Sequence, residues 1–425
     1  MGRRAKGEGS IVKRKDGTWQ AELLLGYSDE GKRQRKFVYG KTQKEVRGKL
    51  DAIKQSIANG TFSDTKMTVR AYLEEWLKEK ARQVKPRTAE LYSYYAKSHI
   101  APSIGRIQLS KLTPVQVQGL LRDVTTKAAS EIDRRKKSAS DASPEAVRDA
   151  GVRTANICRT ILFSALKQAV RWQLIARNPV EAVDPLKVQK KELVLWTLPE
   201  AAHFLDTARP HRLHALFYLA LSTGMRRGEL LGLRWQDIEG STIHVRQSLN
   251  LVDNKITFGV PKTDKGRRRV AISPDVLDAL ATHQKLQEAE RKNLGTLWPD
   301  CGLVFTTEVG TPLYPRNLER AWYALQNKAR NAWLDEATKQ ADEEAVRKLR
   351  NGSLFPHIRF HDLRHLHASI AIRQGMDVKM LADRLGHSRT SLTLDVYTHL
   401  FEDQRANSAV DISGLLTPKS STELN

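Results

Sequence analysis

The sequence is poor in features that mark secreted, metal-stabilised or membrane proteins. It has only two cysteines, Cys158 and Cys301, whose separation matches neither a disulfide framework nor a zinc-binding spacing. The most apolar run, residues 213–221, is too short to span a bilayer and contains His214 and Tyr218. The N-terminus opens on charged residues without the apolar stretch of a secretory signal. We therefore expect a cytoplasmic protein with no structural metal and no membrane partner.

Acidic residues are also scarce relative to basic ones. Lys and Arg number 71 against 48 Asp and Glu, a formal net charge of +23. Such an excess favours a polyanionic partner such as nucleic acid, with an anionic membrane surface as the weaker alternative. The 425 residues suggest roughly three domains.

Residues 9–58 predict a small domain of three strands (10–14, 18–27 and 33–39) and one helix that begins after Thr42. Aromatic residues alternate with basic ones along the strands, a composition that suits a sheet lying in a DNA groove. A solvated basic face is the alternative interpretation. The basic residues that we expect to contact DNA here are Lys13, Arg14, Lys15, Arg33, Arg35 and Lys36.

The next segment, from about residue 66 to 178, predicts an all-helical domain. Apolar residues recur at helical spacing after Thr68, after Thr113 and along residues 157–170. Residues 125–150 lack this periodicity, so we expect an exposed loop or insertion there. Lys85 and Arg87 flank the helices and suit a clamp on the DNA backbone, although a helical bundle of another function would look similar. Two prolines then predict a linker.

A motif of Thr223, Gly224, Arg226 and Glu229 follows the apolar helix at 213–221. Gly224 permits a tight turn, after which Arg226 projects from the start of a second helix and Glu229 lies one turn along to orient it. A purely structural Arg226–Glu229 pair is the alternative interpretation.

Three strands are expected next, at residues 242–245, 255–260 and 268–272. Residues 261–267, between the last two, have the composition of a hairpin turn and carry Lys262. The neighbouring basic residues predicted to contact phosphate are Lys265, Arg267 and Arg268.

The C-terminal region gathers groups suited to attacking a phosphodiester. His361 and Arg364 are three residues apart and share a helix face, while His387 and Tyr397 follow in short predicted helices. A phenol is a poor nucleophile until a base and nearby cations help it lose its proton. The polar neighbours of Tyr397 predict a partly exposed hydroxyl. We expect His365, His367 and His399 to be structural or surface residues.

These motifs occur in the order seen in tyrosine recombinases, and the chain resembles a phage-type integrase over nearly its whole length. The resemblance implies a multidomain protein whose catalytic domain is mixed α+β and mainly helical. The implied parts are an N-terminal arm-type DNA-binding domain with a three-stranded sheet and a helix (1–62), an all-α, SAM-like core-binding domain (63–178), a linker (179–193), the catalytic domain (194–412) and a tail (413–425).

The resemblance also implies the roles of the site residues. Arg226 and Arg364 would bind the phosphate, with Glu229 in support; Lys262 would protonate the leaving group. His361 is placed to accept the proton of Tyr397, which attacks, and His387 to donate a hydrogen bond to the phosphate. The product is a 3′-phosphotyrosyl enzyme, formed without metal, ATP or other cofactor.

The implied partners are double-stranded DNA attachment sites, three further copies of the chain in a tetramer that exchanges strands through a Holliday junction, and accessory DNA-bending and excision proteins. The implied function is integration of a phage or other mobile element. A type IB topoisomerase and a non-catalytic DNA-binding regulator are the alternatives. Two departures from the family pattern are a charged helical segment at residues 335–351 and Leu366, where a small polar residue is expected.

Overall fold

The computed structural model describes residues 10–27, 33–58, 66–136, 144–188, 193–260, 266–391, 393–394 and 397. The chain divides into two compact units, Met1–Lys190 and Lys191–Asn425, and each is described by itself. Lys262, Lys265, His399 and the predicted tail lie outside the described residues. In the described part of the chain no helix is long and apolar enough to cross a membrane. The boundaries of three domains remain predictions.

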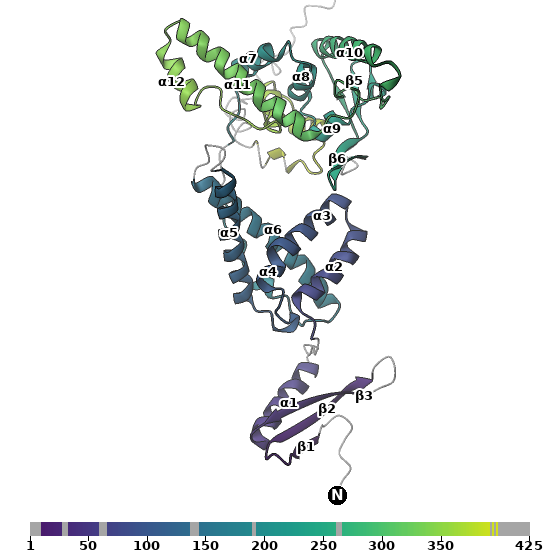
Figure 1. Cartoon of the computed structure of the whole chain (residues 1–425), viewed down its shortest axis with the longest axis vertical. Helices are drawn as coiled ribbons and strands as arrows, with labels where there is room; N and C mark the ends of the chain where they lie inside the picture. The colour runs from purple at the N-terminus through teal and green to yellow at the C-terminus, as the bar shows by residue number, and fades with distance from the viewer. Residues whose placement is uncertain are drawn as a thin grey trace, which may run out of the picture. The chain divides into compact units, whose positions relative to one another are not determined.

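The first unit begins with the expected antiparallel sheet, in the order β1–β2–β3 (Figure 1). Its core is small: the inward side chains of Ala21, Leu23 and Val38 pack with Val46 and Leu50 of the following helix. The prediction of three strands and one helix is confirmed. The elements are β1 (Ser10–Lys13), β2 (Trp19–Tyr27), β3 (Arg33–Gly40) and α1 (Gln43–Ala58).

The rest of this unit is helical and has its own apolar core. Thr68 caps the first helix by accepting a hydrogen bond from the backbone N–H of Ala71, as its position predicts. The helices are α2 (Val69–Gln83), α3 (Pro86–Tyr95), the π-helix η1 (Ala96–Ile100), α4 (Ala101–Ile104), η2 (Leu109–Lys111), α5 (Pro114–Lys136), α6 (Pro144–Arg171) and η3 (Pro179–Ala182).

The prediction of a loop over residues 125–150 is wrong in the part that the structure describes. Helix α5 continues to Lys136 and α6 begins at Pro144. Ala and Lys are good helix formers, and Ala128 lies in an otherwise polar stretch, buried with 6% exposure. The helical propensity of these residues and the burial of Ala128 are consistent with a helix whose sequence shows little periodicity.

The second unit holds the motifs singled out in the sequence. Helix α8, which precedes Gly224, is apolar and buried, and packs against α10 and α13. The helical elements are α7 (Leu198–Ala208), α8 (His214–Thr223), α9 (Arg227–Leu231), η4 (Trp235–Asp237), α10 (Pro274–Leu294), η6 (Gly295–Leu297), α11 (Pro315–Lys339), α12 (Glu343–Asn351), α13 (Asp362–Arg373) and α14 (Val378–Leu385).

Five short strands form two small sheets, β4–β5–β8 and β6–β7. The expectation that 255–260 and 268–272 flank one hairpin is wrong: β7 pairs with β6, whereas β8 pairs with β5. The β6–β7 turn is made by Asp253 and Asn254, both at positive φ. The strands are β4 (Ile238–Glu239), β5 (Thr242–Val245), β6 (Ser248–Val252), β7 (Lys255–Gly259) and β8 (Arg268–Ala271).

The two departures from the family pattern lie within the packed unit. Residues 335–351 form the end of α11 and the whole of α12, joined by a short turn at Ala341. Leu349 of α12 is fully buried in the main core. Leu366 is also part of that core, with 3% exposure, so an apolar side chain suits its surroundings.

Candidate active site

The turn between α8 and α9 forms one side of the site. Gly224 ends α8 in the left-handed conformation, with φ of 62°. A Cβ atom there would lie 2.7 Å from Cδ2 of His367 and 2.8 Å from Cδ2 of Leu385. The turn therefore needs glycine for its backbone angle and for its close packing. The predicted tight turn at this position is confirmed.

Arg226 follows that turn and is oriented by Glu229 in the predicted way. The Nη1 group of Arg226 donates to Oε1 of Glu229 at 2.9 Å, and its backbone N–H donates to Oε2 at 2.9 Å. The side chain of Arg226 remains 40% exposed, whereas that of Glu229 is 3% exposed. The carboxylate is thus a buried support for a guanidinium that reaches the surface.

Three arginines bind three consecutive backbone carbonyls at the C-terminal end of α14. Arg268 Nε donates to the carbonyl of Arg384 at 2.6 Å and Arg364 Nη2 to that of Leu385 at 2.6 Å. Arg226 Nη2 donates to the carbonyl of Gly386 at 2.9 Å. The last carbonyls of a helix lack partners within it and carry partial negative charge, so they are suited to hold cations. The helix end brings Arg226 and Arg364 together.

Of the two predicted phosphate ligands, Arg226 and Arg364, Arg364 is the more deeply buried. Its residue is 4% exposed, and its Nη1 group also donates to the carbonyl of Gly224 at 2.7 Å. Burial, together with the charges of Arg226 and Arg268, lowers the pKa of Arg364 to about 9. The guanidinium therefore stays charged at neutral pH, in a place where an anion would relieve the repulsion between cations.

Arg268 was expected to contact DNA phosphate from the surface, and the structure contradicts this. Its side chain is 6% exposed and donates to both carboxylate oxygens of Glu229, at 3.1 and 2.9 Å. Burial would raise the pKa of Glu229, but the hydrogen bonds and charge of Arg268, with Arg226, leave it below its ordinary value. A run of basic residues near a turn gave no sign that one of them was internal.

Tyr397 lies against α13, where its hydroxyl is 2.7 Å from Nδ1 of His365. The expected partner was His361, so that prediction is wrong for the resting structure. The residue is also 2% exposed rather than partly exposed, because it packs with Ile372 and Leu381. Burial raises the pKa of Tyr397, and the charge of Arg364 opposes the rise.

His365 is the functional candidate that the sequence interpretation missed. A signal was present: it lies four residues after His361, so the two share a face of α13. Their rings are 5.6 Å apart and perpendicular. Burial lowers the pKa of His365, while Asp362 opposes the change. The lowered pKa favours the neutral ring, which can accept a proton from the phenol when Nδ1 carries none.

The two other predicted histidines lie around the same cations. His387 follows the carbonyls that hold the arginines, and its Nδ1 is 2.8 Å from the hydroxyl of Thr393. Burial and then the charges of Arg364 and Arg226 lower the pKa of His387 to about 4. His361 is exposed at the start of α13, and its pKa is lowered because neighbouring atoms displace water from the ring and His365 and Arg364 lie near.

His367, expected to be structural, has that role. Its Nδ1 is 2.9 Å from the carbonyl of Leu221, and Nε2 accepts a hydrogen bond from Nε of Arg384 at 3.1 Å. Arg384 also donates to the carbonyls of Ser222 and Ala271. The pair ties α13 and α14 to the end of α8, next to the turn at Gly224.

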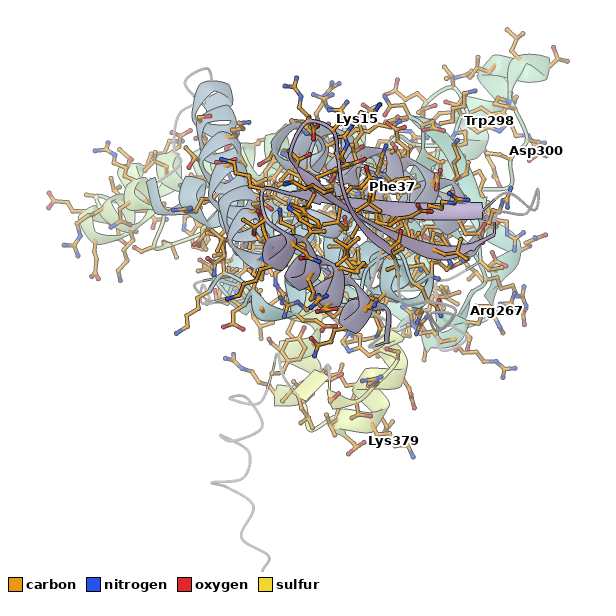
Figure 2. All side chains as sticks on the ribbon, turned by 90° about the horizontal axis from the view of Figure 1, so that it is seen from below. Lys15, Phe37, Arg267, Trp298, Asp300 and Lys379 are labelled. Atoms are coloured by element: carbon orange, nitrogen blue, oxygen red, sulfur yellow. The ribbon has the colours of Figure 1, made fainter. Side chains whose placement is uncertain are left out.

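The predicted DNA contacts of the N-terminal sheet fall on different faces. The strand register places Lys13 and Lys36 on the side covered by α1, and Arg35 on the uncovered side. Arg14 lies over the ring of Tyr39 and pairs with Asp16, while Lys15 is exposed at the β1–β2 turn (Figure 2). The exposed apolar residues of the uncovered side are Val12, Leu24, Phe37 and Tyr39.

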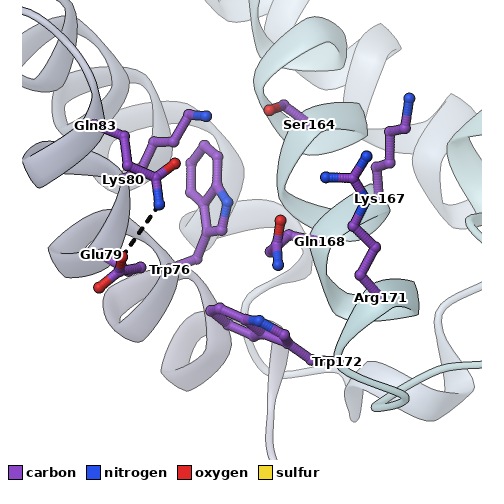
Figure 3. Close-up of a pocket in the computed structure, with 9 residues that line it drawn as sticks. All are labelled: Trp76, Glu79, Lys80, Gln83, Ser164, Lys167, Gln168, Arg171 and Trp172. Carbon is purple, nitrogen blue, oxygen red and sulfur yellow. Dashed lines mark hydrogen bonds between the residues drawn. The ribbon is translucent and has the colours of Figure 1, made fainter.

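The helical part of the first unit has a pocket between α2 and α6, with a volume of about 570 Å³. Figure 3 shows Lys80 on one wall and Lys167 and Arg171 on the other, with Trp172 at the edge. Lys85 and Arg87, at the start of α3, are exposed outside this lining, as is Arg267 in the second unit (Figure 2). The pocket lining is Trp76, Glu79, Lys80, Gln83, Ser164, Lys167, Gln168, Arg171 and Trp172.

Comparisons with known proteins agree with this fold. A family model described as "Phage integrase family" matches residues 197–404, and one described as "Phage integrase, N-terminal SAM-like domain" matches residues 68–123. Together they cover more than half of the chain. The chain belongs to the phage integrase family, and its activity is that of a tyrosine recombinase.

Two solved structures and one curated relative illustrate the likeness. A tyrosine recombinase XerC-like protein of Caldanaerobacter subterraneus is 26% identical over 420 residues, covering 93% of this chain and 96% of the relative. The Tn1549 transposon integrase, solved with a circular intermediate DNA, has a TM-score of 0.58 at 20% identity and covers 80% of this chain and 98% of its own. A lambda integrase tetramer bound to a Holliday junction has a TM-score of 0.50 at 18% identity, covering 90% and 96%.

Proposed function

We propose that Tyr397 attacks a DNA phosphodiester held by Arg226 and Arg364, in the course of integrating a phage or other mobile element. The observation that carries the proposal is the placement of both guanidiniums on adjacent carbonyls, those of Gly386 and Leu385. Two fixed cations suit the two non-bridging oxygens of a phosphate, whose negative charge grows as a fifth ligand adds to phosphorus.

His365 is the base in this proposal. A bond forms between the phenolic oxygen of Tyr397 and phosphorus, the bond from phosphorus to the 5′ oxygen breaks, and the phenolic proton passes to His365 over the 2.7 Å hydrogen bond. His387 donates to a phosphate oxygen. Protonation of the 5′ oxygen by Lys262 rests on the family resemblance alone.

Buried Glu229 acts through Arg226 rather than on DNA. Because Oε1 and Oε2 accept from both the side chain and the backbone of Arg226, the guanidinium is held ready before DNA arrives. Preorganised cations lower the free energy of the transition state more than mobile ones, since no reorganisation accompanies the reaction.

DNA binding in this proposal also uses surfaces of the first unit. The uncovered side of the N-terminal sheet, with Arg35, Phe37 and Tyr39, suits a DNA groove. The pocket between α2 and α6 suits a segment of DNA backbone, with Lys167 and Arg171 contacting its phosphates.

The substitution Lys167→Gln should lower the affinity for DNA. It should also reduce the dependence of that affinity on salt concentration by about one released counterion. The matched control is Lys111→Gln, an exposed lysine outside the lining.

Strand exchange requires more than one copy of the chain on DNA. The lambda integrase tetramer on a Holliday junction, which shares this fold, supports a tetramer on two attachment sites. Accessory DNA-bending and excision proteins, and a cytoplasmic location on the nucleoid, belong to the same proposal.

The direct test is a covalent adduct. Purified protein is incubated in EDTA with labelled, nicked DNA from the region flanking its gene, and resolved by denaturing electrophoresis. We expect a shifted, protease-sensitive band that Tyr397→Phe lacks. The phenylalanine retains the packing against Ile372, so circular dichroism should show a folded variant. Tight DNA binding by the wild-type protein without any adduct, on this and on other substrates, would favour a non-catalytic regulator.

A further inference from the structure

Arg268 joins three elements that meet at the candidate active site. It comes from the first residue of β8, contacts Glu229 of α9 through both Nη groups, and reaches the carbonyl of Arg384 in α14 through Nε. Its Nη1 also donates to the carbonyl of Gly266. With its side chain 6% exposed and these donors engaged, Arg268 is part of the support of the site rather than its DNA-contacting surface.

Glu229 lies between two arginines and is shared by them. Oε1 accepts from Nη1 of Arg226 at 2.9 Å and from Nη1 of Arg268 at 3.1 Å. Oε2 accepts from the backbone of Arg226 and from Nη2 of Arg268, both at 2.9 Å. Glu229 and its two arginine partners together carry one net positive charge. Of the two arginines, Arg226 is the exposed one.

We propose that Arg268 is a positioning residue that neutralises Glu229 and so leaves the charge of Arg226 available to the DNA phosphate. The inference rests on the proposed function. Glu229 is needed to orient Arg226, yet its buried charge would oppose the binding of an anion. Arg268 removes that conflict. Its buried guanidinium balances the negative charge of Glu229, while the guanidinium of Arg226 faces the surface.

Charge at the site then matches charge on the reacting phosphate. Arg226, Arg268, Arg364 and Glu229 together carry two positive charges, and a pentacoordinate phosphorane carries two negative charges. Without Arg268 the set would carry only one, and Arg226 would be drawn toward an otherwise unpaired buried carboxylate. The ground-state phosphodiester carries a single negative charge, so the loss should fall on the chemical step more than on DNA binding.

The test compares Arg268→Gln with wild type on two nicked DNA substrates, one with an ordinary scissile phosphate and one with a methylphosphonate. The methyl group replaces one non-bridging oxygen, so the phosphorane carries one negative charge instead of two, which matches the single positive charge that the site keeps in Arg268→Gln. Single-turnover adduct formation and DNA affinity are measured separately. On the ordinary phosphate we expect Arg268→Gln to slow adduct formation about 10- to 100-fold with DNA affinity unchanged. On the methylphosphonate its rate should stay within about 3-fold of wild type.

Arg269→Gln is the matched control, because Arg269 is the next residue of β8 and is exposed. It should leave the rate on both substrates unchanged. Equal slowing of Arg268→Gln on both substrates would mean that Arg268 is merely structural, and no slowing on either would also overturn the proposal. Absence of any adduct with wild-type protein would instead refute the proposed function itself.

A double variant tests the role of charge in a second way. Combining Arg268→Gln with Glu229→Gln removes one positive and one negative charge, so the net charge of the site returns to that of wild type. We expect the double variant to form the adduct at least about 5-fold faster than Arg268→Gln alone, although slower than wild type because Arg226 is less firmly oriented. A double variant no faster than the single one would contradict the role of charge.

Discussion

Arginines of the two units differ in how completely the protein holds them. In the N-terminal sheet, the side chains of Arg14 and Arg35 are 48% and 42% exposed and pair with surface carboxylates. In the candidate active site, the side chain of Arg268 is 6% exposed, and the whole residue Arg364 is 4% exposed. Exposed arginines can adapt to a long, variable DNA surface, whereas the buried ones are fixed by the carboxylate and the carbonyls that they contact.

The arginines of the candidate active site can be buried because the C-terminal end of α14 supplies acceptors for their N–H groups. Burying a guanidinium is costly unless its donors are satisfied. The three carbonyls after Asp383 have no acceptor role within the helix, and a carboxylate lies beside them, so the arginines replace water with fixed partners. Exposed arginines need no such partners, so Arg35 can stand at an ordinary position of β3 and Arg14 just after β1.

The comparison predicts its largest effect at Arg364. Arg364→Ala should reduce adduct formation at least about 100-fold, because the phosphate loses a preorganised cation. It should also destabilise the second unit by about 2 kcal/mol or more, since the carbonyls of Gly224 and Leu385 lose their donor. Arg373→Ala, on an exposed position of the same helix, is the control for rate and for urea unfolding. Similar losses in both variants would show that α13, not this guanidinium, is responsible.

Two glycines with positive φ extend the comparison to the backbone. Gly224→Ala places a Cβ 2.7 Å from His367, whereas Gly17→Ala, at φ of 82° in the β1–β2 turn, meets nothing within 4 Å. We expect about 1 kcal/mol of local destabilisation at Gly17 and about 3 kcal/mol at Gly224, where overpacking adds to backbone strain. Amide hydrogen exchange of α8–α9 and β1–β2 peptides measures each. Equal effects at the two positions would contradict the packing shown by the structure.

Acid should lower the stability of the second unit and leave that of the N-terminal sheet unchanged. Burial and the charge of Arg384 lower the pKa of His367 to about 4, below its ordinary value, so the folded state binds fewer protons than the unfolded state between about pH 6.5 and 4. Stability is therefore full above that range and falls as the pH is lowered through it, by about 1.4 kcal/mol per pH unit for this group. All twelve histidines follow residue 98.

Urea unfolding at pH 7 and pH 5 measures this dependence. His367→Asn, whose amide can still donate to the carbonyl of Leu221, should unfold more easily at pH 7 but show a shallower loss at pH 5. An unchanged pH slope in that variant would assign the acid sensitivity to other histidines, such as His387, whose pKa is also about 4.

The smallest effect is expected at Arg35. Its exposed pair with Glu22 should contribute less than about 0.5 kcal/mol to stability, so Arg35→Gln should leave unfolding nearly unchanged. Its DNA affinity should fall, with a salt slope lower by about one counterion. Lys49→Gln, in α1 on the other side of the sheet, is the control. A large loss of stability in Arg35→Gln would remove the contrast between the two groups of arginines.

Local patterns gave much of the fold. The strands and the helix of the N-terminal sheet follow from alternation and turn residues, and Thr68 caps α2 as its position predicts. Prediction from the sequence failed where contacts between distant segments decide the secondary structure or the strand pairing. The described residues of 125–150 are helical although their sequence lacks the period of a helix, and β7 pairs with β6 rather than with β8.

The sequence by itself determined the family, the order of the motifs and the chemical types present: two arginines, histidines and a tyrosine, each recognisable from its spacing. Only the tertiary structure decided which of them meet. It put His365 rather than His361 on Tyr397, and turned Arg268 inward to Glu229. The physical reason is that burial and hydrogen bonding depend on elements more than a hundred residues apart, such as Gly224 and Arg364, and no local pattern records which side chain fills the space between them.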